Sequence, residues 1–291
     1  MHDPLPAAWR FEAIGTSWRI DTPAELTEVQ RATVTARIDE FDRAWSRFRD
    51  DSLVSRIARE PGHHRLPADA PPLLDWYREL YEGTAGQLSP LVGRALETLG
   101  YDASYRLTPL AVRERVPTWQ DALARDGTHL DTVGPVMLDV GAAGKGYLVD
   151  LVGEVLNDLG VTTSIVDAGG DLRARGDATL RVALEHPRDA TKAIGVVELH
   201  QGALCASASN RRAWGDGLHH VLDALTGEPT SAVIATWVLH ADALHADGLA
   251  TALFFGHSGS QLAGRHAAPY LRMYANGRVE SSPDFPGEVF R

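Results

Sequence analysis

Residues 138–160 read LDVGAAGKGYLVDLVGEVLNDLG and place a carboxylate, a glycine-rich loop and a helix in one stretch. The pattern predicts that Asp139 ends a strand and that the loop then leads into a helix over 144–158. Apolar residues recur every three or four positions along this helix and give it one buried face. They are Leu148, Leu151, Val152, Val155 and Leu156. Gly160 follows the last of them, where a glycine commonly ends a helix.

The loop has the composition of a ligand-binding turn. Glycines let the backbone approach a bulky ligand closely, and the first free N–H groups of the helix, together with Lys145, would attract a phosphate. The spacing is not that of a Walker loop, because Gly141 lies too close to the lysine and Gly146 follows it. A glycine-rich turn that only caps a helix would look the same, so this stretch alone leaves the function open.

Helical and strand-like patterns follow each other irregularly along the rest of the chain. Helices are expected over 23–48, 70–84, 92–99 and 241–255. Residues 9–20 indicate a strand bent or interrupted at Gly15, and Asn276-Gly277 indicates a hairpin turn in a strand-rich second half. This order favours an α+β fold with mixed or antiparallel sheets and packed helices over a doubly wound sheet. With no repeat or long linker, we expect a single catalytic domain over 1–291, with room for two lobes.

Composition limits the partners of the chain. Its 28 basic and 39 acidic residues give a net charge of −11, and no basic run exceeds Arg211-Arg212, which argues against nucleic acid as a partner. Lysine is rare, with only Lys145 and Lys192. Cys205 is the one cysteine, which excludes an intramolecular disulfide and a multi-thiolate metal site. Without a signal-peptide pattern or an apolar run of about 18 residues, we expect a cytoplasmic protein with no integral membrane segment.

Three further clusters contain polar residues that chemistry could use. Residues 166–171, VDAGGD, suit a tight turn between two carboxylates. The neighbours His219 and His220 would point to opposite faces of a strand, so at most one readily serves a given site. Asp247 and Thr251 lie four apart on a predicted helix and therefore face the same way, as hard oxygen ligands suited to Mg²⁺ completed by substrate phosphate and water. Each cluster taken alone also has a purely structural explanation.

Together, the clusters resemble the motifs of the FAD:protein FMN transferase (ApbE) family in their order and separation. That family shows Met-Gly-Thr after an aromatic strand, a DxGGxAKGxxxD block, an NAGGD turn, an SGxxxR segment, an HxIDPxTG block and an ADxxAT helix. The corresponding segments here are Ile14–Thr16, Asp139–Asp150, Asp167–Asp171, Ser207–Arg212, His220–Gly227 and Ala246–Thr251. Six motifs in register cover almost the whole chain.

The resemblance implies an ApbE-like (T-fold-like) α+β fold. It also implies Mg²⁺-dependent cleavage of FAD, with transfer of FMN to a threonine or serine hydroxyl of an acceptor protein through a phosphoester bond and release of AMP. The positions matching family contacts to the flavin nucleotide are Ile14, Gln87, Leu88, Ser89, Asp139, Lys145 and Val221. The implied metal ligands are the carbonyl oxygen of Ala142 and the side chains of Asp247 and Thr251. His220 matches the histidine proposed as the base for the attacking hydroxyl.

The chain departs from the family pattern at several positions. The family's Phe-Asp-Pro-Thr stretch is Leu88–Leu91 here, so Ser89 replaces a carboxylate of the flavin region. Asp-Pro has become Asp223-Ala224, and Ile14 replaces a methionine. Two other functions therefore remain open from the sequence: an Mg²⁺-dependent FAD pyrophosphatase with water as the nucleophile, and a flavin-binding protein that has lost catalysis.

Overall fold

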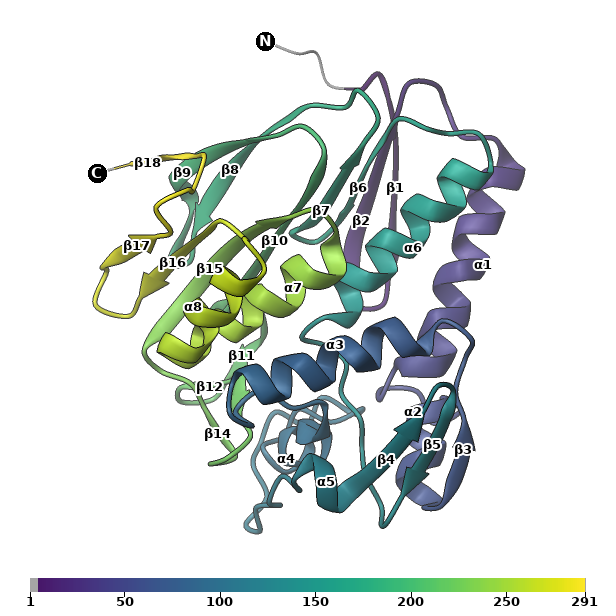
Figure 1. Cartoon of the computed structure of the whole chain (residues 1–291), viewed down its shortest axis with the longest axis vertical. Coiled ribbons are helices and arrows are strands. Elements are labelled where there is room, and N and C mark those ends of the chain that lie inside the picture. The colour runs from purple at the N-terminus through teal and green to yellow at the C-terminus, as the bar shows by residue number, and fades with distance from the viewer. Residues whose placement is uncertain (1–4, 291) are drawn as a thin grey trace.

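An eight-stranded sheet forms the centre of the computed structural model, which describes residues 5–290 (Figure 1). Its order is β1-β2-β6-β7-β10-β15-β16-β17, and every neighbouring pair is antiparallel. The bounds are β1 (Ala7–Ala13), β2 (Thr16–Thr22), β6 (Ser164–Ala168), β7 (Asp171–Arg175), β10 (Gly202–Ala208), β15 (Val233–His240), β16 (Tyr270–Tyr274) and β17 (Val279–Ser281). The expected α+β class with antiparallel sheets is therefore confirmed.

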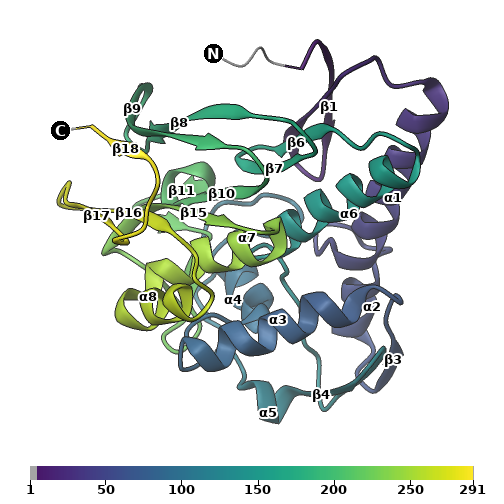
Figure 2. The same ribbon diagram turned by 45° about the horizontal axis from the view of Figure 1, so that its top comes forward.

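Both faces of the central sheet are covered, so its strands alternate between two apolar cores. Val166 belongs to the core on the helical side, whereas its neighbour Ile165 belongs to the core on the other side. The helical layer contains α1 (Glu28–Trp45), α6 (Gly144–Asp158), α7 (Ala243–Ala252), α3 (Ala70–Gly83) and α8 (Gly256–Arg265). The opposite face is covered by β8 (Leu180–His186), β9 (Asp189–Leu199) and β18 (Glu288–Val289). Figure 2 shows these layers in order, with α3 outside α6 and α7.

Smaller elements complete the fold around the ends of these layers. The helices are α2 (Leu53–Arg59), α4 (Gly93–Thr98) and α5 (Trp119–Ala122), with the 3₁₀ turns η1 (Pro90–Val92), η2 (Ser209–Arg212) and η3 (Leu253–Phe255). A second small sheet contains β3 (His63–Arg65), β5 (His129–Thr132) and β4 (Leu123–Asp126). Two short ribbons pair β11 (Ala213–Trp214) with β12 (Leu218–His219) and β13 (Leu222–Asp223) with β14 (Glu228–Pro229). Within residues 5–290 no helix is both long and apolar enough to cross a membrane.

Most of the predicted helices are confirmed. The helix predicted over 144–158 is α6, and the prediction over 241–255 corresponds to α7 followed by η3. The helix predicted from residue 23 instead begins at Glu28, because Thr27 and Gln30 cap each other's backbone N–H groups. At the C-terminal end of α6, Gly160 adopts a φ of +81° just beyond the helix, as expected for a glycine stop.

The segment over 9–20 forms a hairpin rather than a bent strand. Ala13 pairs with Thr16, which leaves Ile14 and Gly15 as a two-residue turn with φ values of +46° and +72°. Two positive φ values are the signature of a type I′ turn, which reverses the chain between antiparallel strands. A β-branched residue rarely adopts a positive φ, so Ile14 is held in a strained conformation. Because β2 pairs with β6, this turn lies near the β6–β7 turn. Both turns line the cavity described below.

The prediction that Asp139 ends a strand is wrong. Residues 135–140 have no regular secondary structure and belong to no sheet. Leu138 is buried and the N–H of Asp139 donates to the carbonyl oxygen of Pro90 at 2.7 Å. Apolar burial without a neighbouring strand therefore produced a strand-like pattern in a connection that leads into α6.

Candidate active site

A cavity of about 930 Å³ lies where the sequence motifs meet. Its walls come from the β1–β2 turn, the start of α6, the β6–β7 turn, α7 and the segment after β12. Ten of the eleven residues predicted as site residues line it: Ile14, Leu88, Ser89, Asp139, Ala142, Lys145, His220, Val221, Asp247 and Thr251. This volume is in the range of small-molecule binding sites.

Gln87 is the predicted site residue that does not line the cavity. Its side-chain amide donates to a carboxylate oxygen of Asp223 at 2.8 Å, and its carbonyl accepts from the N–H of Ala224 at 2.9 Å. These bonds hold the segment that carries Leu88 and Ser89 against the β13–β14 ribbon. Ser89 itself is buried, and its hydroxyl caps η1 by accepting from the N–H of Leu91.

The three predicted metal ligands lie at one corner of the cavity. The hydroxyl of Thr251 donates to the carbonyl oxygen of Ala142 at 3.3 Å, so a loop oxygen and a helix oxygen are already neighbours. Asp247, one turn earlier on α7, accepts from the N–H of Gly146 at 2.9 Å. A Cβ at Gly146 would collide with the carbonyl oxygen of Ala243, so glycine is what allows the start of α6 to approach α7 so closely.

Carboxylates outnumber cations at this corner. Lys145 forms an ion pair with Asp171, which is fully buried and has one carboxylate oxygen without a hydrogen-bond partner in the described part of the chain. Burial and the neighbouring charge of Asp171 raise the pKa of Asp247 well above its ordinary value. Burial disfavours the charge of Lys145, but Asp171 and Asp247 outweigh this and raise the pKa of Lys145. The ammonium of Lys145 thus interacts electrostatically with two buried carboxylates, those of Asp171 and Asp247.

A second corner of the cavity holds an ion pair between Asp139 and Arg47. Asp139 accepts from Nε of the buried Arg47 at 2.6 Å and from the N–H of Gly141 at 2.8 Å. Burial disfavours the charged carboxylate, but Arg47 and this N–H outweigh it and lower the pKa of Asp139. The guanidinium also donates to the carbonyl of Tyr101 at 2.7 Å, and the guanidinium of Arg212, at the cavity wall, donates to the hydroxyl of Tyr101.

The two adjacent histidines divide as the sequence predicts. His219 is buried, contacts the carbonyl oxygen of Thr230 through Nε2 at 2.7 Å and accepts from the N–H of Val221 through Nδ1 at 3.3 Å. His220 faces the cavity, and its Nδ1 has no hydrogen-bond partner within residues 5–290. Burial, with the nearby charges of Arg212 and His219, lowers the pKa of His220 to about 4. His220 is therefore neutral at pH 7 and free to accept a proton.

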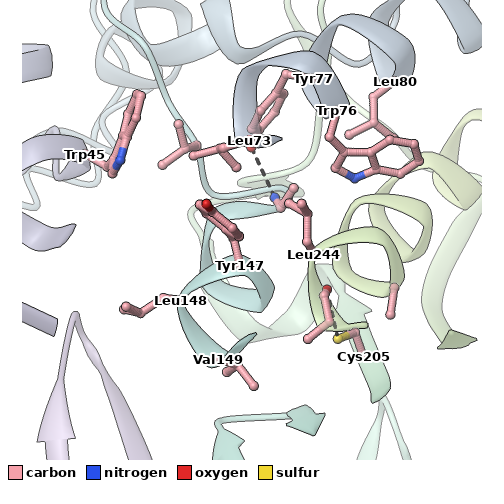
Figure 3. Packing of buried hydrophobic residues seen from close by; sticks show 14 of the residues in the cluster. Trp45, Leu73, Trp76, Tyr77, Leu80, Tyr147, Leu148, Val149, Cys205 and Leu244 are labelled. Atoms are coloured by element: carbon pink, nitrogen blue, oxygen red, sulfur yellow. Dashed lines mark hydrogen bonds between the residues drawn. The ribbon is translucent and has the colours of Figure 1, made fainter. Parts of the chain in front are cut away.

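Tyr77 supports the metal-ligand loop and was not predicted. Its hydroxyl, fully buried on α3, accepts from the N–H groups of Ala142 and Ala143, both at 3.1 Å. Figure 3 shows Tyr77 reaching toward this loop above α6 and α7. Burial and the charges of Asp139 and Asp247 raise the pKa of Tyr77 well above its ordinary value, so the phenol stays protonated. In the sequence it looks like any core residue of an amphipathic helix.

Comparisons with known proteins agree with this geometry. The sequence profile of the ApbE family matches residues 14–269. The FAD:protein FMN transferase of Klebsiella pneumoniae is 24% identical over 269 residues, which span 83% of this chain and 76% of the relative. The crystal structure of an ApbE protein from Thermotoga maritima has a TM-score of 0.82 at 25% identity and covers 96% of this chain and 97% of its own. The flavinyl transferase ApbE of Pseudomonas stutzeri has a TM-score of 0.82 at 26% identity, covering 95% and 94%.

Proposed function

Since the chain belongs to the ApbE family of flavin transferases, we propose that it is an Mg²⁺-dependent FAD:protein FMN transferase. In this reaction the hydroxyl oxygen of an acceptor threonine or serine forms a bond to the phosphorus on the FMN side of FAD. The bond from that phosphorus to the bridging oxygen breaks, and AMP leaves with that oxygen. The observation that carries the proposal is the meeting of Ala142, Asp247 and Thr251 at a corner of the cavity rich in buried negative charge.

The residues of this corner fit a divalent cation of the magnesium type. All three groups offer hard oxygen atoms, which Mg²⁺ prefers, and they leave further positions for substrate phosphates and water. The unpartnered oxygen of buried Asp171 and the raised pKa of Asp247 both indicate a place where positive charge is missing. When bound there, a divalent ion supplies neutralisation of pyrophosphate charge.

His220 is placed to take the proton of the attacking hydroxyl. A general base must be unprotonated at the working pH, and the lowered pKa of His220 keeps it so. Its Nδ1 has no hydrogen-bond partner within residues 5–290, while His219 makes the structural hydrogen bonds of this segment. Lys145 and Arg212, both lining the cavity, add positive potential for the phosphates of FAD.

Intact-mass spectrometry of an acceptor tests the proposal. The protein is incubated with FAD, Mg²⁺ and acceptor proteins of the ApbE relatives, while AMP and free FMN are quantified. We expect the acceptor to gain one FMN with one AMP released, and both products to disappear with Asp247→Asn but not with Asp158→Asn at the exposed end of α6. AMP and free FMN with no labelled acceptor would instead establish hydrolysis, and intact FAD would overturn both.

A further inference from the structure

A second cluster of ligand-type side chains lies outside the cavity, around the first turn of α7. His240 ends β15, Asp242 caps α7 and His245 lies in its first turn, while His266 ends α8. None of the four lines the cavity. The motifs described above do not include them either, so the transfer reaction leaves this cluster unexplained.

Three of these side chains converge on a single point. His240, Asp242 and His245 each offer one ligand atom, and the three atoms all lie within 4.8 Å of one another. One Asp242 oxygen lies 3.3 Å from Nδ1 of His240, and the other lies 2.7 Å from Nδ1 of His245. Ligands about 2.0–2.1 Å from a tetrahedral Zn²⁺ are about 3.3 Å apart, so binding requires only a small opening of the closer pair.

His266 lies beside this group, but its nitrogen atoms fall outside the 4.8 Å that joins the other three, so its side chain must move to become a fourth ligand. Its ring centroid lies 5.6 Å from that of His245 and 6.3 Å from that of His240, and these two rings are 5.0 Å apart. Imidazoles around one tetrahedral ion have centroids roughly 5 Å apart, by the same bond lengths. Nε2 of His266 contacts a carboxylate oxygen of Glu79 at 2.7 Å. A carboxylate behind an imidazole is the usual arrangement that orients a metal-ligating histidine.

The surroundings suit an ion that enters from solvent. The side chains of His240, Asp242 and His245 are 16%, 33% and 31% exposed, so the cluster is accessible but not fully hydrated. The ring of Trp76, labelled in Figure 3, packs on His245 at 4.5 Å and on His266 at 4.9 Å between centroids and forms an apolar floor. One Asp242 oxygen also accepts from the N–H of His245, so the carboxylate can cap α7 and still offer its second oxygen.

The charge of the cluster suits a cation. Asp242 is the one carboxylate among the four side chains, and its two oxygens lie 2.7 Å and 3.3 Å from imidazole nitrogens of His245 and His240.

We propose that His240, Asp242, His245 and His266 form a binding site for a transition-metal ion of the Zn²⁺ class. Imidazole nitrogens select Zn²⁺ and its neighbours in the first transition series, whereas Mg²⁺ prefers an all-oxygen set, so this site is chemically distinct from the Asp247 corner. The ion ties the end of β15, the start of α7 and the end of α8 together. It thereby stabilises the helix that carries Asp247 and Thr251.

Metal titration of the full chain tests the site. Zn²⁺ is titrated by isothermal calorimetry in excess Mg²⁺, and Co²⁺ is followed by its visible absorption, which is much stronger in tetrahedral than in octahedral sites. We expect one Zn²⁺ per chain, a tetrahedral Co²⁺ spectrum and a higher Tm with Zn²⁺. His245→Ala and His240→Gln should each weaken Zn²⁺ binding by at least the roughly 10–100-fold expected for loss of a supporting group.

The matched control is His257→Ala, which removes an exposed histidine from α8. It should leave the stoichiometry, the Co²⁺ spectrum and the Zn²⁺-induced rise in Tm unchanged. Circular dichroism of each metal-free variant shows whether it is folded, and His266→Gln provides a third independent variant. Binding that survives all three ligand variants, binding lost equally with His257→Ala, or no binding by the folded wild type would overturn the proposal.

Discussion

The two corners of the cavity shift the pKa of a carboxylate in opposite directions. At one corner Asp139 has its own guanidinium, Arg47, and its pKa is lowered. At the other, Asp247 and Asp171 share the single ammonium of Lys145, and the pKa of Asp247 is raised. The Asp139 side chain is 16% exposed and Asp247 is buried, so both burial and the charged partners contribute to the difference.

We propose that this difference separates a carboxylate that mainly stabilises the fold from one that holds a metal ion. A buried ion pair with matched partners is electrically complete, and removing either partner leaves a buried charge unpaired. Two carboxylates with one cation carry an excess negative charge, and a divalent ion would neutralise that charge. We therefore expect substitutions at the Asp139 corner to affect mainly folding, and substitutions at the Asp247 corner to affect mainly catalysis.

The largest effect should follow Asp247→Asn. Loss of a metal ligand removes several kcal/mol of charge stabilisation, which corresponds to about 10⁴-fold or more in FMN transfer. The metal-free variant should be no less stable than wild type, because the amide removes repulsion from Asp171. Transfer assays and urea unfolding measure the two effects, and a variant that unfolds readily while retaining transfer would reverse the assignment of the two corners.

Next comes His220→Asn, with an expected loss of about 10²–10⁴-fold in FMN transfer. The burial of His220, together with the nearby charge of Arg212, also predicts an unusual pH profile. Because the pKa of His220 is lowered to about 4, the neutral base is present above that pH and is lost only as the pH falls through it. At saturating Mg²⁺, kcat/KM should therefore stay flat from pH 7.5 to about pH 5.5, and an inflection near 6.5 that His220→Asn removes would contradict this.

Arg47→Met should act on stability. Unpairing a buried carboxylate costs about 3–5 kcal/mol in the free energy of unfolding, and the variant also loses the bond to the carbonyl of Tyr101. Arg43→Met, at an exposed position of α1, is the matched control. Urea unfolding at pH 7 measures both, and adding Asp139→Asn to Arg47→Met should recover part of the loss. Equal stability of the two arginine variants would show that the pair contributes nothing.

A smaller effect is expected for Tyr77→Phe. The change leaves the N–H groups of Ala142 and Ala143 without their acceptor and loosens the carbonyl oxygen of Ala142. Supporting groups of this kind typically change metal affinity by about 10–100-fold. Tyr81→Phe is the control, since this hydroxyl on the same helix accepts only from the N–H of Trp119 at 3.4 Å. The Mg²⁺ concentration giving half-maximal transfer should rise for the first variant alone.

The sequence predicted the positions of the residues at the Asp247 corner better than it predicted the ion pair at the Asp139 corner. Asp247 and Thr251 were predictable because helical spacing puts both on one face, and α6 was predictable because its apolar period and Gly160 mark its length. Arg47 is 92 residues from Asp139 and one arginine among many, so only the folded chain shows the pair. The small β3–β5–β4 sheet was missed because strands of three or four residues are too short to show a period.

The central claim is tested most directly by counting the divalent ions that each corner holds. Mn²⁺, which shares the oxygen preference of Mg²⁺, is titrated into the protein and followed by the loss of its free-ion electron paramagnetic resonance signal. All variants carry His245→Ala, so that the histidine cluster does not contribute. We predict one bound Mn²⁺ in this background and with Asp139→Asn, and at least a hundredfold weaker binding with Asp247→Asn. Equal loss in both variants, or retention with Asp247→Asn, would contradict the account.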